Sequence, residues 1–308
     1  MTDSAHRDLP HQPRPTGRAR PGAGRPRPSS GETPPPSVWA TAQRSSRAQR
    51  AGRYLPGSMA HPGKMLPAVA RHAVAAYTRP GEVVLDPMCG IGTTLVEAVH
   101  LGRDAVGIEY EPRWADLAGN NLDAAAANGA RGEADVLAGD ARDVTRLLHR
   151  RYHGRVALLL TSPPYGSTTH GRVSRTPDGR VTKTDHRYSK DRANLAHRPL
   201  PALLEGFTEI LDACRPLLAS DAVAVVTARP YRRDGRLVDF PSAVIVAAAE
   251  AGYRLAERNV ALLAGIRGDR LVPRASFFAL HHLRDPRRAH GHRHLLIHED
   301  VLVFVASK

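Results

Sequence analysis

The sequence predicts an α/β fold in which helices cover both faces of a mostly parallel sheet. Strand-like and helix-like segments alternate along residues 67–263, which is the pattern of repeated βαβ units. Residues 156–161 form a continuous apolar run, as expected of a central parallel strand buried on both faces. Residues 83–94 join a short aliphatic strand to a turn that contains Gly90 and Gly92, and an apolar-periodic helix follows. A strand, glycine turn and helix in this order expose backbone N–H groups to a ligand at the carboxyl end of the strand.

The other elements follow the same rhythm. Runs rich in Ala and Leu predict helices, and short runs rich in Val, Ile and Leu predict strands. The expected helices cover 67–77, 112–127, 201–218 and 240–251, and the expected further strands cover 104–109, 134–140, 222–228, 255–263 and 301–305.

Composition bounds the organisation of the chain. It has 308 residues, 42% of them hydrophobic, and a net charge of +14, which suffices for one large domain with extensions and favours a polyanionic partner such as nucleic acid. Residues 1–50 are rich in Pro, Gly, Arg and Ser and almost lack aliphatic side chains, so they are predicted to be a disordered basic tail ahead of a domain at 51–308. The tail is interpreted as a solvated linker or as a non-specific phosphate contact.

Cysteine usage and hydropathy indicate the compartment. The two cysteines, Cys89 and Cys214, form no disulfide framework, and the N-terminus has no apolar signal region. No apolar run approaches the length of a membrane helix. We therefore expect a reducing, cytoplasmic environment and no membrane partner.

The glycine turn favours a cationic ligand. A dinucleotide site requires a third glycine, which is absent after Gly92, and Asp86 stands at the strand tip where a pyrophosphate would be repelled. This argues against a NAD-dependent dehydrogenase. A carboxylate beside a glycine turn suits the sulfonium and amino groups of S-adenosylmethionine.

The nine residues 86–94, Asp-Pro-Met-Cys-Gly-Ile-Gly-Thr-Thr, resemble the cofactor motif D-P-F-x-G-x-G-T-T of amino-group DNA methyltransferases, with Met88 in place of Phe. The resemblance implies a Rossmann-like class I methyltransferase fold, with seven mostly parallel strands and a reversed edge strand. The last two strands, 255–263 and 301–305, would supply the reversed pair. The cofactor implied is S-adenosylmethionine, and the motif residues expected to contact it are Asp86, Pro87, Gly90, Gly92, Thr93 and Thr94.

Acidic residues end three successive predicted strands. Glu109 follows Asp86 by 23 residues, near the usual offset of a carboxylate that accepts from ribose hydroxyls. Asp140 ends the next strand and is expected to accept from the adenine amine. Lys64, in the His-Pro-Gly-Lys segment that precedes the glycine turn, is a candidate for the cofactor carboxylate.

The apolar strand at 156–161 runs into Ser162-Pro163-Pro164-Tyr165, which resembles the catalytic tetrad of the same methyltransferases. The lone pair of an exocyclic amine is delocalised into the base, so the amine is a poor nucleophile. The Ser162 side chain and a carbonyl of Pro163 held rigid by Pro164 would accept its N–H bonds, and Tyr165 would stack on the base. Methyl transfer then needs positioning rather than a covalent intermediate.

The substrate is expected to be a nucleobase. By resemblance, Ser at the first tetrad position is typical of cytosine-N4 enzymes, and Asp or Asn of adenine-N6 enzymes, so DNA cytosine N4 is the first expectation. The motif order, with the glycine turn ahead of the tetrad, is also that of tRNA guanine-N2 methyltransferases, which makes RNA the alternative partner. A non-catalytic nucleic-acid-binding protein on the same fold is a further alternative. Neither cysteine adjoins the tetrad, which argues against a C5-cytosine enzyme.

Two irregular segments complete the chain. Residues 167–198 are a polar, basic insertion after the tetrad, interpreted as a substrate clamp with Tyr188 and Arg192 as candidates, or as a solvated loop. Residues 265–298 contain six histidines without an accompanying cysteine, so we expect a polar or phosphate-facing loop and no metal site.

Overall fold

The computed structural model describes residues 35–165, 172–175, 181–184, 191, 193–233, 236–274 and 294–307. Its central element is an eight-stranded sheet in the order β1-β11-β14-β8-β5-β2-β3-β4. The strands are β1 (Val38–Trp39), β2 (Val83–Asp86), β3 (Asp104–Glu109), β4 (Ala134–Ala138), β5 (Val156–Thr161), β8 (Leu218–Ala228), β11 (Tyr253–Leu262) and β14 (His298–Ala306).

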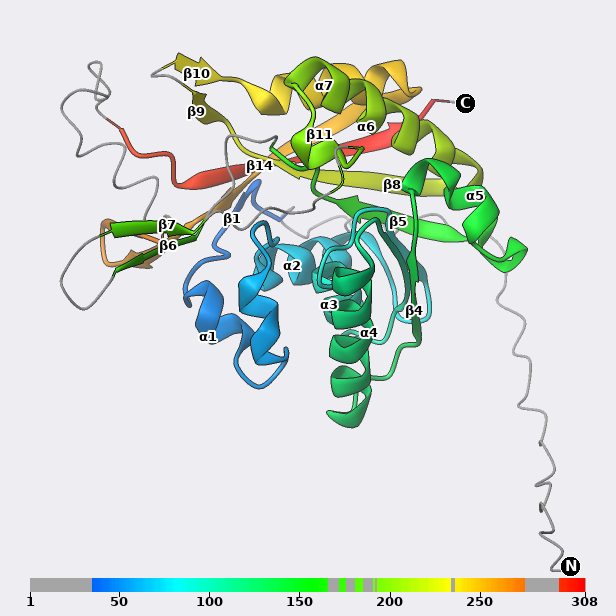
Figure 1. Cartoon of the computed structure of the whole chain (residues 1–308), viewed down its shortest axis with the longest axis horizontal. Coiled ribbons are helices and arrows are strands. Elements are labelled where there is room, and N and C mark those ends of the chain that lie inside the picture. The colour runs from blue at the N-terminus through cyan, green and yellow to red at the C-terminus, as the bar shows by residue number, and fades with distance from the viewer. Residues whose placement is uncertain are drawn as a thin grey trace, which may run out of the picture. The chain divides into compact units, whose positions relative to one another are not determined.

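Helices cover both faces of this sheet (Figure 1). On one face lie α5 (Val144–Leu147), α6 (Leu200–Cys214) and α7 (Phe240–Glu250), and on the other lie α2 (Pro67–Tyr77), α3 (Thr93–His100) and α4 (Pro112–Ala127). The short α1 (Ser46–Arg50) precedes α2. The central strand β5 buries Leu159 on the face covered by α5, α6 and α7, and it buries Leu158 and Leu160 on the face covered by α2, α3 and α4. Burial on both faces explains its uninterrupted apolar sequence.

The predicted fold class is confirmed, because β4-β3-β2-β5-β8 are parallel and the last pair contains one reversed strand. The expected place of the reversed strand is wrong. Strand β14 is antiparallel to both β8 and β11 and lies between them, because the chain turns back after β11 and fills the space beside β8. The sheet also gains the two-residue β1, parallel to β11.

The predicted domain boundary at residue 50 is wrong. Trp39 is 4% exposed and packs in the core beneath α2, and the hydroxyl of Thr41 donates to the Leu262 carbonyl. Arg50 is buried, and its guanidinium donates to the Met65 carbonyl at 2.6 Å. The polar composition of this segment predicted disorder, but its one large apolar side chain, Trp39, anchors it to the domain. Residues 1–34 of the predicted tail lie outside the described residues.

Within the described parts of the chain, three small antiparallel hairpins accompany the main sheet. They are β6 (Arg172–Arg175) with β7 (Val181–Thr184), β9 (Tyr231–Arg233) with β10 (Arg236–Val238), and β12 (Ala264–Arg267) with β13 (Arg270–Pro273). The first lies within the predicted insertion at 167–198, but the end of that segment rejoins the domain, because Ala196 is fully buried. Among the described residues, no helix combines the length and apolarity needed to cross a bilayer.

Candidate active site

The glycine turn links β2 to α3 through two residues with left-handed backbone. Gly90 has φ of +54° and Gly92, the residue that precedes α3, has φ of +77°. L side chains rarely adopt this conformation. A Cβ at Gly92 would also lie 3.1 Å from the Cβ of Ala118 on α4. The turn therefore requires glycine at Gly92 for its backbone and for the close approach of α4.

Asp86 sits at the base of this turn and is 3% exposed. It accepts from the hydroxyl of Thr94 at 2.6 Å, the hydroxyl of Thr161 at 2.8 Å and the backbone N–H of Met88 at 3.1 Å. Burial raises the pKa of Asp86 to about 6, and the three donors partly oppose that effect. Asp86 thus braces the turn from inside, and its expected contact with the cofactor stays a prediction.

Glu109 ends β3 and connects the neighbouring tip to the same turn. One carboxylate oxygen accepts from the N–H of Gly90 at 2.8 Å and the other from the N–H of Glu111 at 3.0 Å. Burial raises the pKa of Glu109 to about 7, against the effect of these two bonds. The side chain is 4% exposed and lines a cleft, so its carboxylate is held at the edge of a pocket with limited access to water.

The third acid, Asp140, follows β4 and also lines the cleft. Arg142 donates to it through its guanidinium at 2.6 Å and through its backbone N–H at 3.0 Å. This hydrogen bonding lowers the pKa of Asp140, so the group is ionised. Arg142 reaches Glu209 as well, at 3.4 Å. Arg142 is a cation in the cleft that sequence reasoning did not single out.

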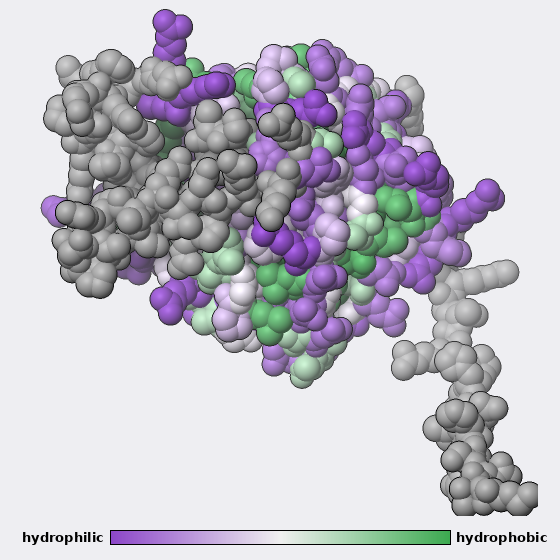
Figure 2. Space-filling view, viewed as in Figure 1, coloured by the Kyte–Doolittle hydropathy of each residue, from purple (hydrophilic) through white to green (hydrophobic). Residues whose placement is uncertain are grey.

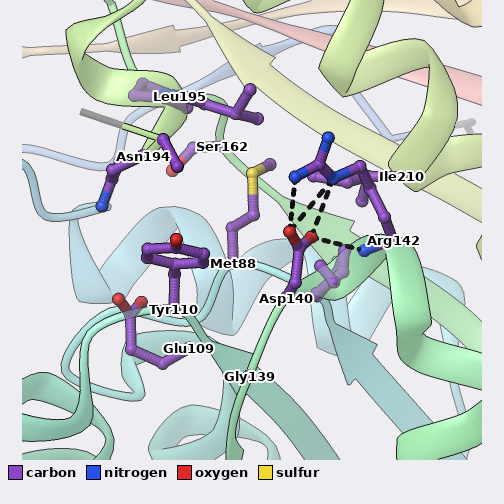
Figure 3. Close-up of a pocket in the computed structure, with 14 residues that line it drawn as sticks. Met88, Glu109, Tyr110, Gly139, Asp140, Arg142, Ser162, Asn194, Leu195 and Ile210 are labelled. Carbon is purple, nitrogen blue, oxygen red and sulfur yellow. Dashed lines mark hydrogen bonds and ion pairs between the residues drawn. The ribbon is translucent and has the colours of Figure 1, made fainter. Parts of the chain in front are cut away.

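One cleft joins the tips of β2, β3, β4 and β5 (Figure 3). Five predicted site residues line it together: Pro87, Glu109, Asp140, Ser162 and Pro164. The remaining lining residues are Met88, Tyr110, Gly139, Ala141, Arg142, Ala193, Asn194, Leu195 and Ile210. The cleft therefore connects the end of the glycine turn to the first residue of the Ser-Pro-Pro-Tyr tetrad.

The tetrad places its members in different surroundings. Ser162 and Pro164 line the cleft, and Pro163 is buried behind them. The ring of Tyr165 lies 5.1 Å from that of Phe240, and the Arg229 guanidinium carbon lies 5.4 Å from its centroid. Burial raises the pKa of the Tyr165 hydroxyl. Tyr165 does not line the cleft, so its stacking on a base stays a prediction.

The far wall of the cleft was missed in the sequence. The hydroxyl of Tyr110 donates to Asp191 at 2.6 Å, and the amide of Asn194 donates to Glu111 at 3.1 Å. The bond to Asp191 raises the pKa of Tyr110 to about 12. These contacts fasten the end of the basic insertion across the cleft. The available signal was Tyr110 and Glu111 directly after the strand acid Glu109.

The segment ahead of the glycine turn packs against it without lining the cleft. His61 is 1% exposed, and its ring lies edge-on to Trp114 with centroids 4.7 Å apart. A Cβ at Gly90 would lie 3.1 Å from this imidazole. Burial lowers the pKa of His61 to about 3, so the ring is neutral. The Lys64 ammonium donates to the His61 and Met59 carbonyls, and its expected contact with the cofactor carboxylate stays a prediction.

Of the remaining residues that the sequence singled out, Thr93 lies buried in the glycine turn, and several others lie outside the described residues. Thr93 is 4% exposed, and its hydroxyl finds no hydrogen-bond partner among the described atoms. Tyr188 and Arg192 lie outside the described residues, as do His281, His282, His290 and His292. Within the described ranges, three or more His, Cys, Asp or Glu side chains nowhere gather into a metal-binding group.

The cleft fits S-adenosylmethionine by its donor set and its shape. Buried Glu109 offers an ionisable acceptor to ribose hydroxyls at a strand tip. Met88, Leu195 and Ile210 offer apolar surface to the adenine. When bound, this cofactor would supply an electrophilic methyl group. Ser162 lines the same cleft and is placed to meet a substrate beside it.

The sequence motifs of this chain are similar to those of known methyltransferases. Residues 11–120 match the sequence model of a family described as DNA methylase. A tRNA (guanine(10)-N2)-dimethyltransferase of Methanocaldococcus jannaschii is 34% identical over 110 residues, which cover 35% of this chain and 31% of that protein. The enzyme of the same name from Methanothermobacter thermautotrophicus is 33% identical over 117 residues, 37% of this chain and 32% of the relative. The chain thus spans about a third of the length of these relatives.

Among solved structures, the chain is similar to TrmN from Thermus thermophilus, with a TM-score of 0.49 and 17% identity over 83% of this chain and 53% of that chain. The predicted resemblance to amino-group methyltransferases, both DNA methylases and tRNA guanine-N2 enzymes, is confirmed by the family model and the two relatives. The first expectation of DNA as the polymer is not supported by these relatives, whose names specify tRNA.

Proposed function

We propose that this chain, which carries the motifs and the fold of S-adenosylmethionine-dependent amino-group methyltransferases, methylates the N2 amine of a guanine in tRNA. The observation that carries the proposal is that one cleft is lined by both Glu109 and Ser162. Glu109 belongs to the side next to the glycine turn, the cofactor half, and Ser162 belongs to the side formed by the Ser-Pro-Pro-Tyr tetrad, the tetrad half. The two tRNA guanine-N2 relatives support guanine as the base and tRNA as the polymer.

The cofactor half would hold the donor. Glu109 would accept hydrogen bonds from the ribose hydroxyls, and Asp140 would accept a hydrogen bond from the adenine amine. The Gly90–Gly92 turn allows the methionine end of the cofactor to approach the backbone closely, because neither residue has a Cβ. The sulfonium methyl would then point toward Ser162, the tetrad residue that lines the same cleft as Glu109.

The tetrad half would activate the amine. The N2 amine of guanine adjoins the ring acceptor N3, and a serine hydroxyl can accept from the amine while it donates to N3. The Pro163 carbonyl, fixed by the two prolines, would accept the second N–H. Both bonds would draw the nitrogen toward tetrahedral geometry, so that its lone pair could bond to the methyl carbon as the bond from that carbon to sulfur breaks. The sulfur would leave as a neutral thioether, and the methylated nitrogen would lose one proton to water. Positioning of the two reactants supplies most of the rate.

A second candidate is cytosine N4 in DNA. Its support is Ser162 itself, since serine opens the tetrad of the cytosine-N4 enzymes that the motif resembles, and the matching family is described as DNA methylase. The N4 amine of cytosine also adjoins a ring acceptor, so the same serine geometry serves both bases.

The proposal is tested by incubating the full chain with methyl-labelled S-adenosylmethionine and, separately, unmodified tRNA or genomic DNA. Nucleosides are then separated after digestion. Label in N2-methylguanosine supports the proposal, and label in N4-methylcytosine supports the second candidate. Absence of label from both polymers, with the cofactor bound, contradicts amino-group methylation of nucleic acid.

A further inference from the structure

The β9–β10 hairpin leaves the main sheet beside the tetrad. Strand β8 pairs in parallel with β5, with Val226 opposite Thr161. The chain continues from the tip of β8 through Arg229 into β9, just as it continues from the tip of β5 into Ser162. The carboxyl ends of adjacent parallel strands lie at the same edge of a sheet. The hairpin, which follows the end of β8 (Figure 1), therefore rises from the same edge of the sheet as the residues that line the cleft.

The base of the hairpin contacts the tetrad directly. The Tyr231 ring lies edge-on to Tyr165, with centroids 6.1 Å apart, and both rings pack on Phe240 of α7. Arg229 lies over the opposite part of this cluster, 5.4 Å from the centroid of Tyr165. These contacts fix the hairpin to Tyr165, the residue that the sequence motif predicts to stack on the target base.

The rest of the hairpin presents cations to solvent. Arg232, Arg233 and Arg236 are exposed, as is Leu237 at 55%. Asp239, which follows β10, uses its carboxylate to cap α7: it accepts from the backbone N–H of Ser242 at 3.2 Å and from the hydroxyl of Ser242 at 2.7 Å. Hydrophilic residues project at the upper left of Figure 2, in the region where Figure 1 draws β9 and β10.

The register of the hairpin opposes two like charges. Arg233 pairs directly across from Arg236. The register therefore brings two cationic residues to the same end of the hairpin.

We propose that the β9–β10 hairpin binds the phosphodiester backbone beside the target nucleotide, with Arg232 and Arg236 as the phosphate contacts. The inference rests on the proposed function, since it assumes a nucleic acid whose base enters at the tetrad. Arginine neutralises phosphates and so fixes the register of a nucleic acid without reading its sequence. The hairpin thereby holds the strand while Ser162 and Tyr165 hold its extruded base.

The test compares two double variants with the same change in charge. Arg232→Glu with Arg236→Glu alters the hairpin. Arg79→Glu with Arg254→Glu alters two exposed arginines at the opposite edge of the sheet, before β2 and at the start of β11. Binding of a tRNA pool and of duplex DNA is measured over a range of salt concentrations without cofactor, and KM and kcat are measured with the polymer that is methylated. Cofactor affinity verifies that each variant is folded.

The hairpin variant is expected to lower the slope of log affinity against log salt by about 2, one for each arginine, and to raise KM about tenfold or more. Its kcat should stay within about twofold of the parent, and the control variant should match the parent. The polymer whose salt slope changes is the ligand. Equal slopes and equal KM for the two variants would overturn the hairpin assignment while methylation by the parent still stands. A parent that methylates neither polymer, with a slope that still falls only in the hairpin variant, would overturn the proposed function and leave the phosphate surface in place.

Discussion

The hydroxyl of Thr161 donates a 2.8 Å hydrogen bond to Oδ1 of Asp86, 75 residues earlier in the chain. The bond ties the tip of β5 to the tip of β2 inside the protein. Ser162 follows directly after one partner, and the glycine turn follows directly after the other. Because both partners are buried, this bond sets the spacing between the glycine turn on the cofactor side of the cleft and Ser162 on the tetrad side.

Replacing Thr161 with valine should therefore reduce both stability and turnover. The variant keeps the shape of the side chain but removes one of the two donors to Oδ1 of Asp86 and leaves only the backbone N–H of Met88 on that oxygen. Loss of this buried bond to a carboxylate should cost about 1–3 kcal/mol in the free energy of unfolding. Loss of the link should lower kcat more than it weakens cofactor binding, because it frees the strand end that carries Ser162. Urea denaturation and steady-state kinetics measure the two effects.

The matched control is Thr208→Val. Its hydroxyl donates to the Ala247 carbonyl between α6 and α7 at 3.2 Å, away from the cleft. This variant should lose less stability and keep kcat. Equal kcat in Thr161→Val and in the parent enzyme would show that the Thr161–Asp86 bond has no part in catalysis.

Glu109 makes cofactor affinity depend on pH. Its pKa is raised to about 7, mainly by burial, so below pH 7 the free protein holds a proton on this group. The ionised carboxylate accepts from ribose hydroxyls much more strongly than the protonated acid, so binding below pH 7 favours loss of that proton. The Kd for S-adenosylmethionine should fall about fivefold between pH 6 and pH 7, fall about twofold more by pH 8, and level off above that pH. Isothermal titration calorimetry in buffers of different ionisation enthalpy should show the released proton.

The control for this prediction is Glu109→Gln, which removes the titrating group. Its cofactor Kd should be weaker and should not vary over the same range of pH. Asp86 also has a raised pKa, of about 6, so Asp86→Asn provides the second comparison and should retain the dependence. If the glutamine variant shows the same slope as the parent, the titrating group is not Glu109.

Tyr110 should contribute to cofactor affinity through the wall that it fastens. Tyr110→Phe removes the 2.6 Å bond to Asp191 and leaves the ring that lines the cleft. The loss of one such bond costs about 0.5–1.5 kcal/mol, so the Kd for S-adenosylmethionine should weaken by about 2- to 10-fold. Tyr77→Phe removes a similar 2.7 Å bond to Glu257 outside the cleft, and it should leave the Kd unchanged. Equal affinities in the two variants would separate the Tyr110–Asp191 bond from cofactor binding.

The sequence predicted those parts of the site that local pattern determines. The glycine turn, the acids at the strand tips and the Ser-Pro-Pro-Tyr tetrad each occupy a few adjacent residues, and parallel strands necessarily bring their carboxyl ends to one edge. The far wall was not predictable in this way. Asn194 reaches Glu111 across 83 residues, and nothing in the polar composition of 167–198 distinguishes its end from a solvated loop.

The roles of individual acids were harder to predict than their positions. Asp86 and Glu109 both end strands, yet Asp86 points into a network of three internal donors and Glu109 lines the cleft. The partners of Asp86 come from Thr94 and Thr161, which are distant from one another in the chain. The tail boundary was wrong for a similar reason, because Trp39 packs in a core formed by α2 and β11, which are far from each other in the sequence.

Ser162 provides the test that separates the chemistry of the amine from the binding of the cofactor. Ser162→Ala removes the hydroxyl that would accept from the exocyclic amine and donate to the adjacent ring nitrogen. The group acts on the substrate in the transition state, so kcat should fall about 100-fold while the cofactor Kd stays within about twofold. Ser162→Asp is the informative partner variant, because a carboxylate accepts hydrogen bonds but cannot donate to N3. Guanine also presents an N1–H donor beside its amine, whereas cytosine presents only an acceptor there. The aspartate variant should therefore retain more activity on a guanine substrate than on a cytosine substrate, as measured by nucleoside analysis of both polymers. An alanine variant with parental kcat on the methylated polymer would remove Ser162 from the reaction.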